Sequence, residues 1–152
     1  MTTMLTRREG LTVLTQTLVV SIAEHRKAVD ITANVRDGVR HAGIHNGLVI
    51  ANCLHTTCSV LVAEAGPALL DDFVQLMGRF IQDGNRYHHN DSRLSDCERG
   101  NATAHLRSSL LGHSVALGIA DGELLLDGSD SILLAEWDGP RLRRVHIQIM
   151  GV

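Results

Sequence analysis

Apolar residues alternate with polar ones along several short stretches of the chain, and this period of two predicts β-strands. The clearest stretch is Leu142 to Met150, where Val145, Ile147 and Ile149 alternate with charged or polar residues. One face of this strand is therefore expected to pack on the core, and the other to face water or an interface. Further strands are predicted at Leu11 to Val20, Ala28 to Thr32, Ser114 to Ala120, Glu123 to Leu126 and Ser131 to Trp137.

The run from Leu48 to Ser59 is also strand-like, and it is apolar on both faces for much of its length. This is typical of a central strand that is buried or covered by a partner. On a continuous strand Cys53, His55, Thr57 and Ser59 share one face, because side chains alternate. The pattern thus predicts an imidazole beside two hydroxyl groups, with Cys53 and Cys58 on opposite faces.

Helical spacing appears in three segments. Asn34 to Ala42 places apolar residues four apart and stops at Gly43, and a longer amphipathic segment begins at Pro67 and is closed by Gly84. A third helix is predicted from Ala102 to Leu111, with Asn101 as a candidate N-cap. The segment from Asp83 to Gly100 is almost wholly polar, and a loop of that length is usually functional or disordered.

Two turn signals complete the fold prediction. Asp121-Gly122 lies between two predicted strands, and Asp138-Gly139-Pro140 lies between the last two, so both pairs are expected to form hairpins. The predicted class is α+β, with a mainly antiparallel sheet and about three helices. Residues 1–152 are expected to form a single domain.

Composition narrows the function classes. At 152 residues and 44% hydrophobic content, the chain is long enough to bury the core of one domain. The net charge of -3, with both signs interspersed, argues against nucleic acid or a membrane surface as a partner. Its apolar runs are shorter than the roughly 20 residues of a membrane span. Three cysteines without a CxxC pair suit a reducing compartment, so a cytoplasmic protein is expected.

Three histidines lie in short polar motifs far apart in the chain: His55 in HTTCS, His89 in YHHND and His105 in NATAHL. Neutral imidazole is the commonest metal ligand, and three of them would leave a coordination position open for water or substrate. The spacing lacks the diagnostic pattern of an HExxH site. From the residues alone, a buried histidine, a loop residue and a helix-surface group remain the alternatives, with His88 competing with His89.

Four ordered motifs resemble the YjbQ family, also called UPF0047: HTTCS with Glu64 following, YHHND, NATAHLRSSLLG and LAEWDGPR. The resemblance spans nearly the whole chain. It implies a small α+β protein, usually a homotrimer, with a histidine cluster that binds metal near subunit boundaries. By motif position the family's ligands fall on His55, His89 and His105. The family is associated with secondary thiamine-phosphate synthase activity.

The ligand set and its neighbours define the expected site. A divalent metal, best zinc, suits three imidazoles. Glu64 is the candidate catalytic proton-transfer group, with a solvated carboxylate as the alternative. Guanidinium and hydroxyl groups suit phosphate oxygens. The candidate phosphate-binding residues are Arg107, Ser108, Thr57 and Ser59.

The expected partner is a small phosphorylated metabolite, and three functions remain open. The first is a thiamine-phosphate synthase-type enzyme that joins hydroxymethylpyrimidine diphosphate to thiazole phosphate and releases pyrophosphate. The second is a metal-dependent hydrolase in which Glu64 acts as general base. The third is a non-catalytic trimeric protein that binds metal or phosphate.

Overall fold

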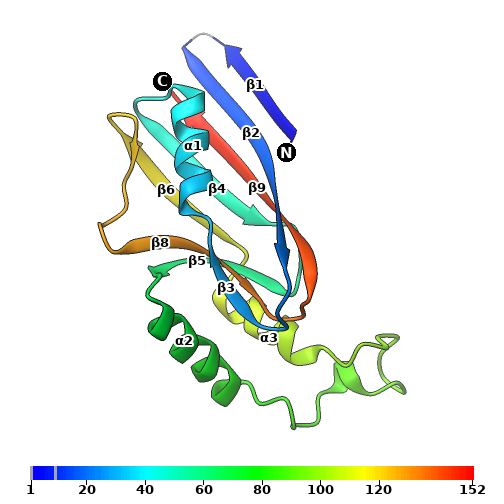
Figure 1. The fold of residues 1–152 in the computed structure, drawn as a ribbon. Helices are drawn as coiled ribbons and strands as arrows, with labels where there is room; N and C mark the ends of the chain where they lie inside the picture. Colours follow the sequence, from blue (N-terminus) through cyan, green and yellow to red (C-terminus); the bar gives the residue numbers. More distant parts are fainter. Residues whose placement is uncertain (1, 9) are drawn as a thin grey trace.

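Two antiparallel sheets dominate the computed structural model, which describes residues 2–8 and 10–152, the first segment as backbone only (Figure 1). The larger sheet has the strand order β1-β2-β9-β4-β6-β7 and the smaller one β3-β8-β5. The larger sheet contains β1 (Thr2–Arg8), β2 (Leu11–Ile22), β9 (Arg141–Gly151), β4 (Gly47–Cys53), β6 (Ser114–Ala120) and β7 (Glu123–Leu124). The smaller sheet contains β3 (Lys27–Asp30), β8 (Asp130–Glu136) and β5 (Cys58–Glu64).

Three α-helices pack on these sheets, which confirms the predicted α+β class. Helix α1 (Thr32–Ala42) lies on the larger sheet, while α2 (Pro67–Phe80) and α3 (Ala102–Leu111) lie beside the smaller one (Figure 1). The predicted stop of α1 is confirmed, because Gly43 adopts the left-handed conformation at φ 63°. Within the described residues, no helix combines the length and apolarity that a membrane crossing requires.

The core has two parts, one on each face of the smaller sheet. Val60, Ile132 and Leu134 face the larger sheet and α1, while Ala135 and Trp137 face α2 and α3. Strand β8 is therefore buried on both faces, which explains its continuous apolar sequence. The predicted inward face of β9 is confirmed, because Val145, Ile147 and Ile149 are fully buried.

The prediction of one strand from Leu48 to Ser59 is wrong. Strand β4 ends at Cys53, β5 begins at Cys58, and the two belong to different sheets. The chain crosses between the sheets through residues 54–57, so the alternation of side chains is interrupted there. As a result His55 does not share a strand face with Thr57 and Ser59. Cys53 and Cys58, predicted on opposite faces, belong to the same part of the buried core.

The second predicted hairpin is also wrong, although the first is confirmed. Ile119 pairs with Leu124 across Asp121-Gly122. Strand β8 instead pairs with β3 and β5, and β9 pairs with β2 and β4. The segment that contains the cis Gly139-Pro140 bond therefore connects two sheets rather than two neighbouring strands.

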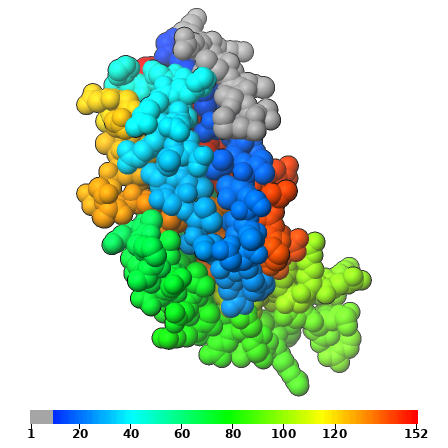
Figure 2. All heavy atoms as spheres, in the orientation of Figure 1, coloured from blue at the N-terminus to red at the C-terminus, as the bar shows by residue number. Residues whose placement is uncertain are grey.

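The long polar segment after α2 lies at the end of the molecule opposite the chain termini (Figure 1). It forms a projection on the surface (Figure 2). Helix α2 ends at Phe80 rather than at the predicted Gly84, and the segment that follows contains the short 3-10 helix η1 (His88–Asn90). Residues 81–101 thus place His89 close to the first residues of α3.

Candidate functional site

His89 and His105 face each other at the junction of η1 and α3. Their ring centroids lie 5.0 Å apart and the ring planes meet at 77°. The Nε2 atom of His89 is buried and has no hydrogen-bond partner in residues 10–152. Because buried polar atoms are almost always paired, this nitrogen is a candidate for binding a metal ion or a ligand atom.

A side-chain cap holds the two histidines together. Asn90, the residue after His89, accepts a hydrogen bond at Oδ1 from the backbone N–H of Ala102, at 2.9 Å. This bond ties η1 to the first turn of α3, one turn before His105. Asn101, the predicted N-cap, makes no capping bond; its Nδ2 donates to Asp138 Oδ2 at 3.0 Å.

The surroundings of His105 favour neutral imidazole, the form that binds metals. Burial and the neighbouring His89 lower the pKa of His105. The Asp138 carboxylate and the Thr56 backbone raise this pKa, but by less, so it is lowered overall. A pocket of about 320 Å³ opens onto this pair, and Tyr87, His88 and Leu106 also line it. The two rings are therefore accessible to a small ligand.

His55 lies in the crossover between β4 and β5, and its ring is engaged elsewhere. Its Nε2 accepts a hydrogen bond from the backbone N–H of Arg144 at 3.0 Å. Burial and the charges of Arg143 and Arg144 lower the pKa of His55. In the part of the chain that the structure describes, no three His, Cys, Asp or Glu side chains are arranged to hold a metal ion. The structure thus brings together His89 and His105, without His55.

All four candidate phosphate-binding side chains are buried and have internal partners. Arg107 donates to the backbone oxygens of Met77 and Ile81 and to Asp83, so it fastens α3 to the end of α2. Ser108 donates to the Cys58 carbonyl oxygen. Thr57 accepts from Arg143 at 2.8 Å, and Ser59 accepts from the Trp137 indole at 3.1 Å. The Nη1 atom of Arg107, however, is buried without a hydrogen-bond partner in residues 10–152, and phosphate binding by these four residues stays a prediction.

Glu64, the predicted proton-transfer group, lies away from the histidines. It is exposed at the last position of β5, whereas the crossover with His55 precedes the first position, Cys58. Six residues of strand separate the two ends by about 20 Å. The backbone of Thr56, beside the Cys58 end of β5, interacts with His105, so within one chain Glu64 is remote from His105.

Sequence reasoning missed two acidic residues at the end of β8: Glu136, its last residue, and Asp138, two residues later. Glu136 is fully buried and accepts hydrogen bonds from both Nε and Nη2 of Arg143, and from the backbone N–H of Asp138 at 2.6 Å. Asp138 also accepts from Arg141 at 3.3 Å and acts on His105 through its charge. Glu136 and Asp138 belong to the LAEWDGPR motif. This motif supported the family resemblance but indicated no role for either side chain.

Comparison with known proteins supports a single family. The model of the family described as UPF0047 protein YjbQ-like matches residues 16–152. A UPF0047 protein of Archaeoglobus fulgidus is 35% identical over 88% of this chain and 98% of its own, and UPF0047 protein YugU of Bacillus subtilis is 31% identical over 90% and 98%. A YbjQ-like protein of unknown function from Sulfolobus solfataricus P2 is similar in structure, with a TM-score of 0.86 and 29% identity over 93% of this chain and 99% of that one.

Proposed function

Because the chain belongs to the UPF0047 YjbQ-like family, we propose that it is a cytoplasmic metal-dependent enzyme of the thiamine-phosphate synthase type. The observation that carries the proposal is the unpartnered, buried Nε2 of His89 beside the ring of His105. A buried nitrogen without a partner costs free energy, which a bound cation would offset. The lowered pKa of His105 supports the same proposal, because a protonated imidazole cannot bind a metal.

His89 and His105 would hold the metal, and His55 would join them if its ring exchanged the bond from the Arg144 backbone for the metal. Zinc suits such a set of imidazoles best. When bound, the metal supplies positive charge that stabilises a departing diphosphate. The negative charge of Asp138, which acts on His105, would favour a cation bound there.

The proposed reaction breaks one bond and forms one. The bond between the pyrimidine methylene carbon and the diphosphate oxygen breaks, and pyrophosphate leaves with the electron pair. The thiazole phosphate nitrogen forms a bond to that carbon and gives thiamine phosphate. The role of the chain is to bind and orient both substrates in the pocket beside His89 and His105 and to exclude water from it.

We also propose that the protein is a homotrimer. Exposed apolar side chains on the outer face of the larger sheet support this proposal, because α1 packs on the opposite face. They include Val19 and Leu142, which are 53% and 66% exposed and which point away from the buried residues of their own strands. Across the two strands, Val19 pairs with Arg144 and Leu142 pairs with Ser21, so this face carries both apolar and polar side chains. Such a mixed composition is usual at protein interfaces.

A product assay tests the activity. Purified protein is supplied with zinc and hydroxymethylpyrimidine diphosphate, with and without thiazole phosphate, and the products are separated by chromatography. The proposal predicts thiamine phosphate only when both substrates are present, and its loss in His105→Ala but not in the control His41→Ala, at an exposed position of α1. Hydrolysed pyrimidine diphosphate alone would support the hydrolase instead. Bound metal without any turnover would support a non-catalytic binding protein.

A further inference from the structure

Helix α2 presents a stripe of exposed apolar side chains. Leu69, Leu76 and Phe80 are 47%, 59% and 71% exposed. They follow each other at intervals of seven and four residues, so they lie along one side of the helix. Figure 2 shows this helix at the surface of the molecule. Single exposed leucines are common, but large apolar side chains aligned on one helix are typical of a surface that packs against a partner.

The spacing of the stripe is that of two paired helices. When the partly buried Phe73 is included, the four side chains follow each other at intervals of four, three and four residues. This is the alternation of the a and d positions in a coiled coil, in which two helices pack side by side. Phe73 also packs on Trp137 of its own chain, with ring centroids 5.9 Å apart, so the core fixes the direction in which the stripe faces.

Two opposite charges lie beside the stripe without partners. Asp72 and Arg79 are exposed and seven residues apart, so they lie on the same flank of α2. Within residues 10–152, neither side chain takes part in a hydrogen bond or an ion pair, although the Arg79 carbonyl oxygen accepts from Gln82. The flank therefore offers one unpaired carboxylate and one unpaired guanidinium, each of which can bind an opposite charge on a partner.

An antiparallel second copy of α2 complements both the stripe and the charges. The midpoint between Leu69 and Phe80 lies just before Gln75. The midpoint between Asp72 and Arg79 lies one residue later, about 1.5 Å along the helix. A two-fold axis at this point places the Asp72 carboxylate beside Arg79 of the second copy, and the contact occurs twice by symmetry. A parallel pair would instead bring like charges to the same level.

We propose that α2 pairs with α2 of a second copy of this chain, in antiparallel orientation about a two-fold axis near Gln75. The apolar stripe supplies the contact, and the two pairs between Asp72 and Arg79 select the orientation. One helix of 14 residues from each chain offers less than the roughly 800 Å² per partner of a stable interface, so the pairing is weak and depends on concentration. It uses a helix beside the smaller sheet, and therefore depends neither on the proposed trimer nor on the proposed function.

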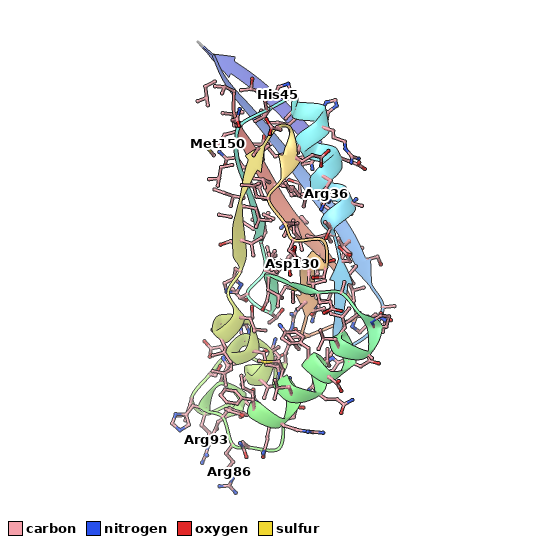
Figure 3. All side chains as sticks on the ribbon, turned by 90° about the vertical axis from the view of Figure 1, so that its left-hand side faces the viewer. Arg36, His45, Arg86, Arg93, Asp130 and Met150 are labelled. Atoms are coloured by element: carbon pink, nitrogen blue, oxygen red, sulfur yellow. The ribbon has the colours of Figure 1, made fainter. Side chains whose placement is uncertain are left out.

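Charge reversal tests the pairing. Asp72→Arg brings arginines opposite each other at both symmetric contacts, and Arg79→Asp brings carboxylates opposite each other. The double variant restores opposite charges only if the partner is an identical helix in antiparallel orientation. The control is Arg86→Asp, an exposed arginine whose side chain points into solvent at the end of the molecule (Figure 3).

Sedimentation equilibrium of the full-length proteins, from about 10 μM to about 1 mM, measures pairing as a rise of the mean mass with concentration. We expect this rise in the unmodified protein and in Arg86→Asp. Each single reversal should lower the association constant about tenfold, and the double variant should recover it. Circular dichroism verifies that each variant keeps its fold.

Two results would overturn the inference. The first is a mean mass of the unmodified protein that does not change with concentration. The second is a double variant that pairs as weakly as the single reversals, because α2 would then bind a different partner or pair in a different orientation.

Discussion

Asp83 shows how a single side chain joins three segments of the molecule. It accepts hydrogen bonds from Arg26, from Arg107 and from Thr103, the last at 2.8 Å. Burial raises its pKa, but the hydrogen bonds from Arg26 and Thr103 and the charge of Arg107 outweigh burial and lower the pKa to about 2. The ionised carboxylate is therefore more stable in the folded protein than in the unfolded chain.

Replacement of this carboxylate should give a stability loss that depends on pH. A lowered carboxyl pKa contributes stability that is present above the unfolded value of about 4 and is lost as the pH falls towards 2. Asp83→Asn should therefore cost about 1 kcal/mol at pH 7, since the half-exposed group is partly screened. Urea unfolding at several pH values measures this cost. A difference that stays constant between pH 7 and pH 2.5 would contradict the account.

At the residue scale, His89 was distinguished from His88 by its position in the YHHND motif and not by its spacing from other histidines. His88 is exposed, whereas the Nε2 of His89 is buried without a partner. The sequence could not place the ring of His55, because its orientation depends on a bond to the Arg144 backbone, 89 residues later. Nor could it reveal that Arg107 is buried, since its acceptors belong to α2 and to Asp83.

At the scale of elements, the sequence predicted those helix ends that depend on the backbone preferences of the residues at the ends. Pro67 begins α2 and Gly43 ends α1, as expected from their backbone preferences. The strands were predicted by alternation, but their assignment to sheets was not. The periodicity does not reveal that the chain leaves one sheet after Cys53 and enters the other at Cys58, because both strands are apolar.

The cap on α3 can be tested at this scale. Asn90→Ala removes the acceptor for the Ala102 N–H and should cost about 1 kcal/mol of stability, a typical value for a lost cap. It should also weaken metal binding, because His89 is no longer held against α3. The control is Asn85→Ala, an exposed residue of the same loop. Equal metal affinity and equal melting temperature in both variants would refute this role for Asn90.

At the scale of the whole molecule, a buried ion pair joins the two sheets. Glu136 ends β8 of the smaller sheet and Arg143 lies in β9 of the larger one, and both are almost completely buried. Arg143→Met leaves a buried carboxylate without its partner, so a loss of roughly 3–5 kcal/mol is expected in denaturant unfolding. Arg144→Met, on the exposed face of the same strand, should cost far less. Comparable losses in the two variants would argue against the pair as a link between the sheets.

The proposed trimer makes a separate prediction. Sedimentation equilibrium should give about three times the chain mass of 16.5 kDa. Val19→Glu with Leu142→Glu should lower that mass, because two carboxylates would be buried in an apolar interface. Phe80→Glu, on the exposed side of α2, should not. A mass equal to one chain for the unmodified protein would rule out the trimer.

The central claim is that His89 and His105 bind a metal ion, and elemental analysis of purified variants tests it most directly. The unmodified protein, after zinc loading and desalting, should hold about one zinc ion per chain. His89→Ala and His105→Ala should lose most of the bound zinc, and His88→Ala should retain it. His55→Ala should also lose zinc if the His55 ring joins the pair. Zinc content that is unchanged in both His89→Ala and His105→Ala would contradict the account.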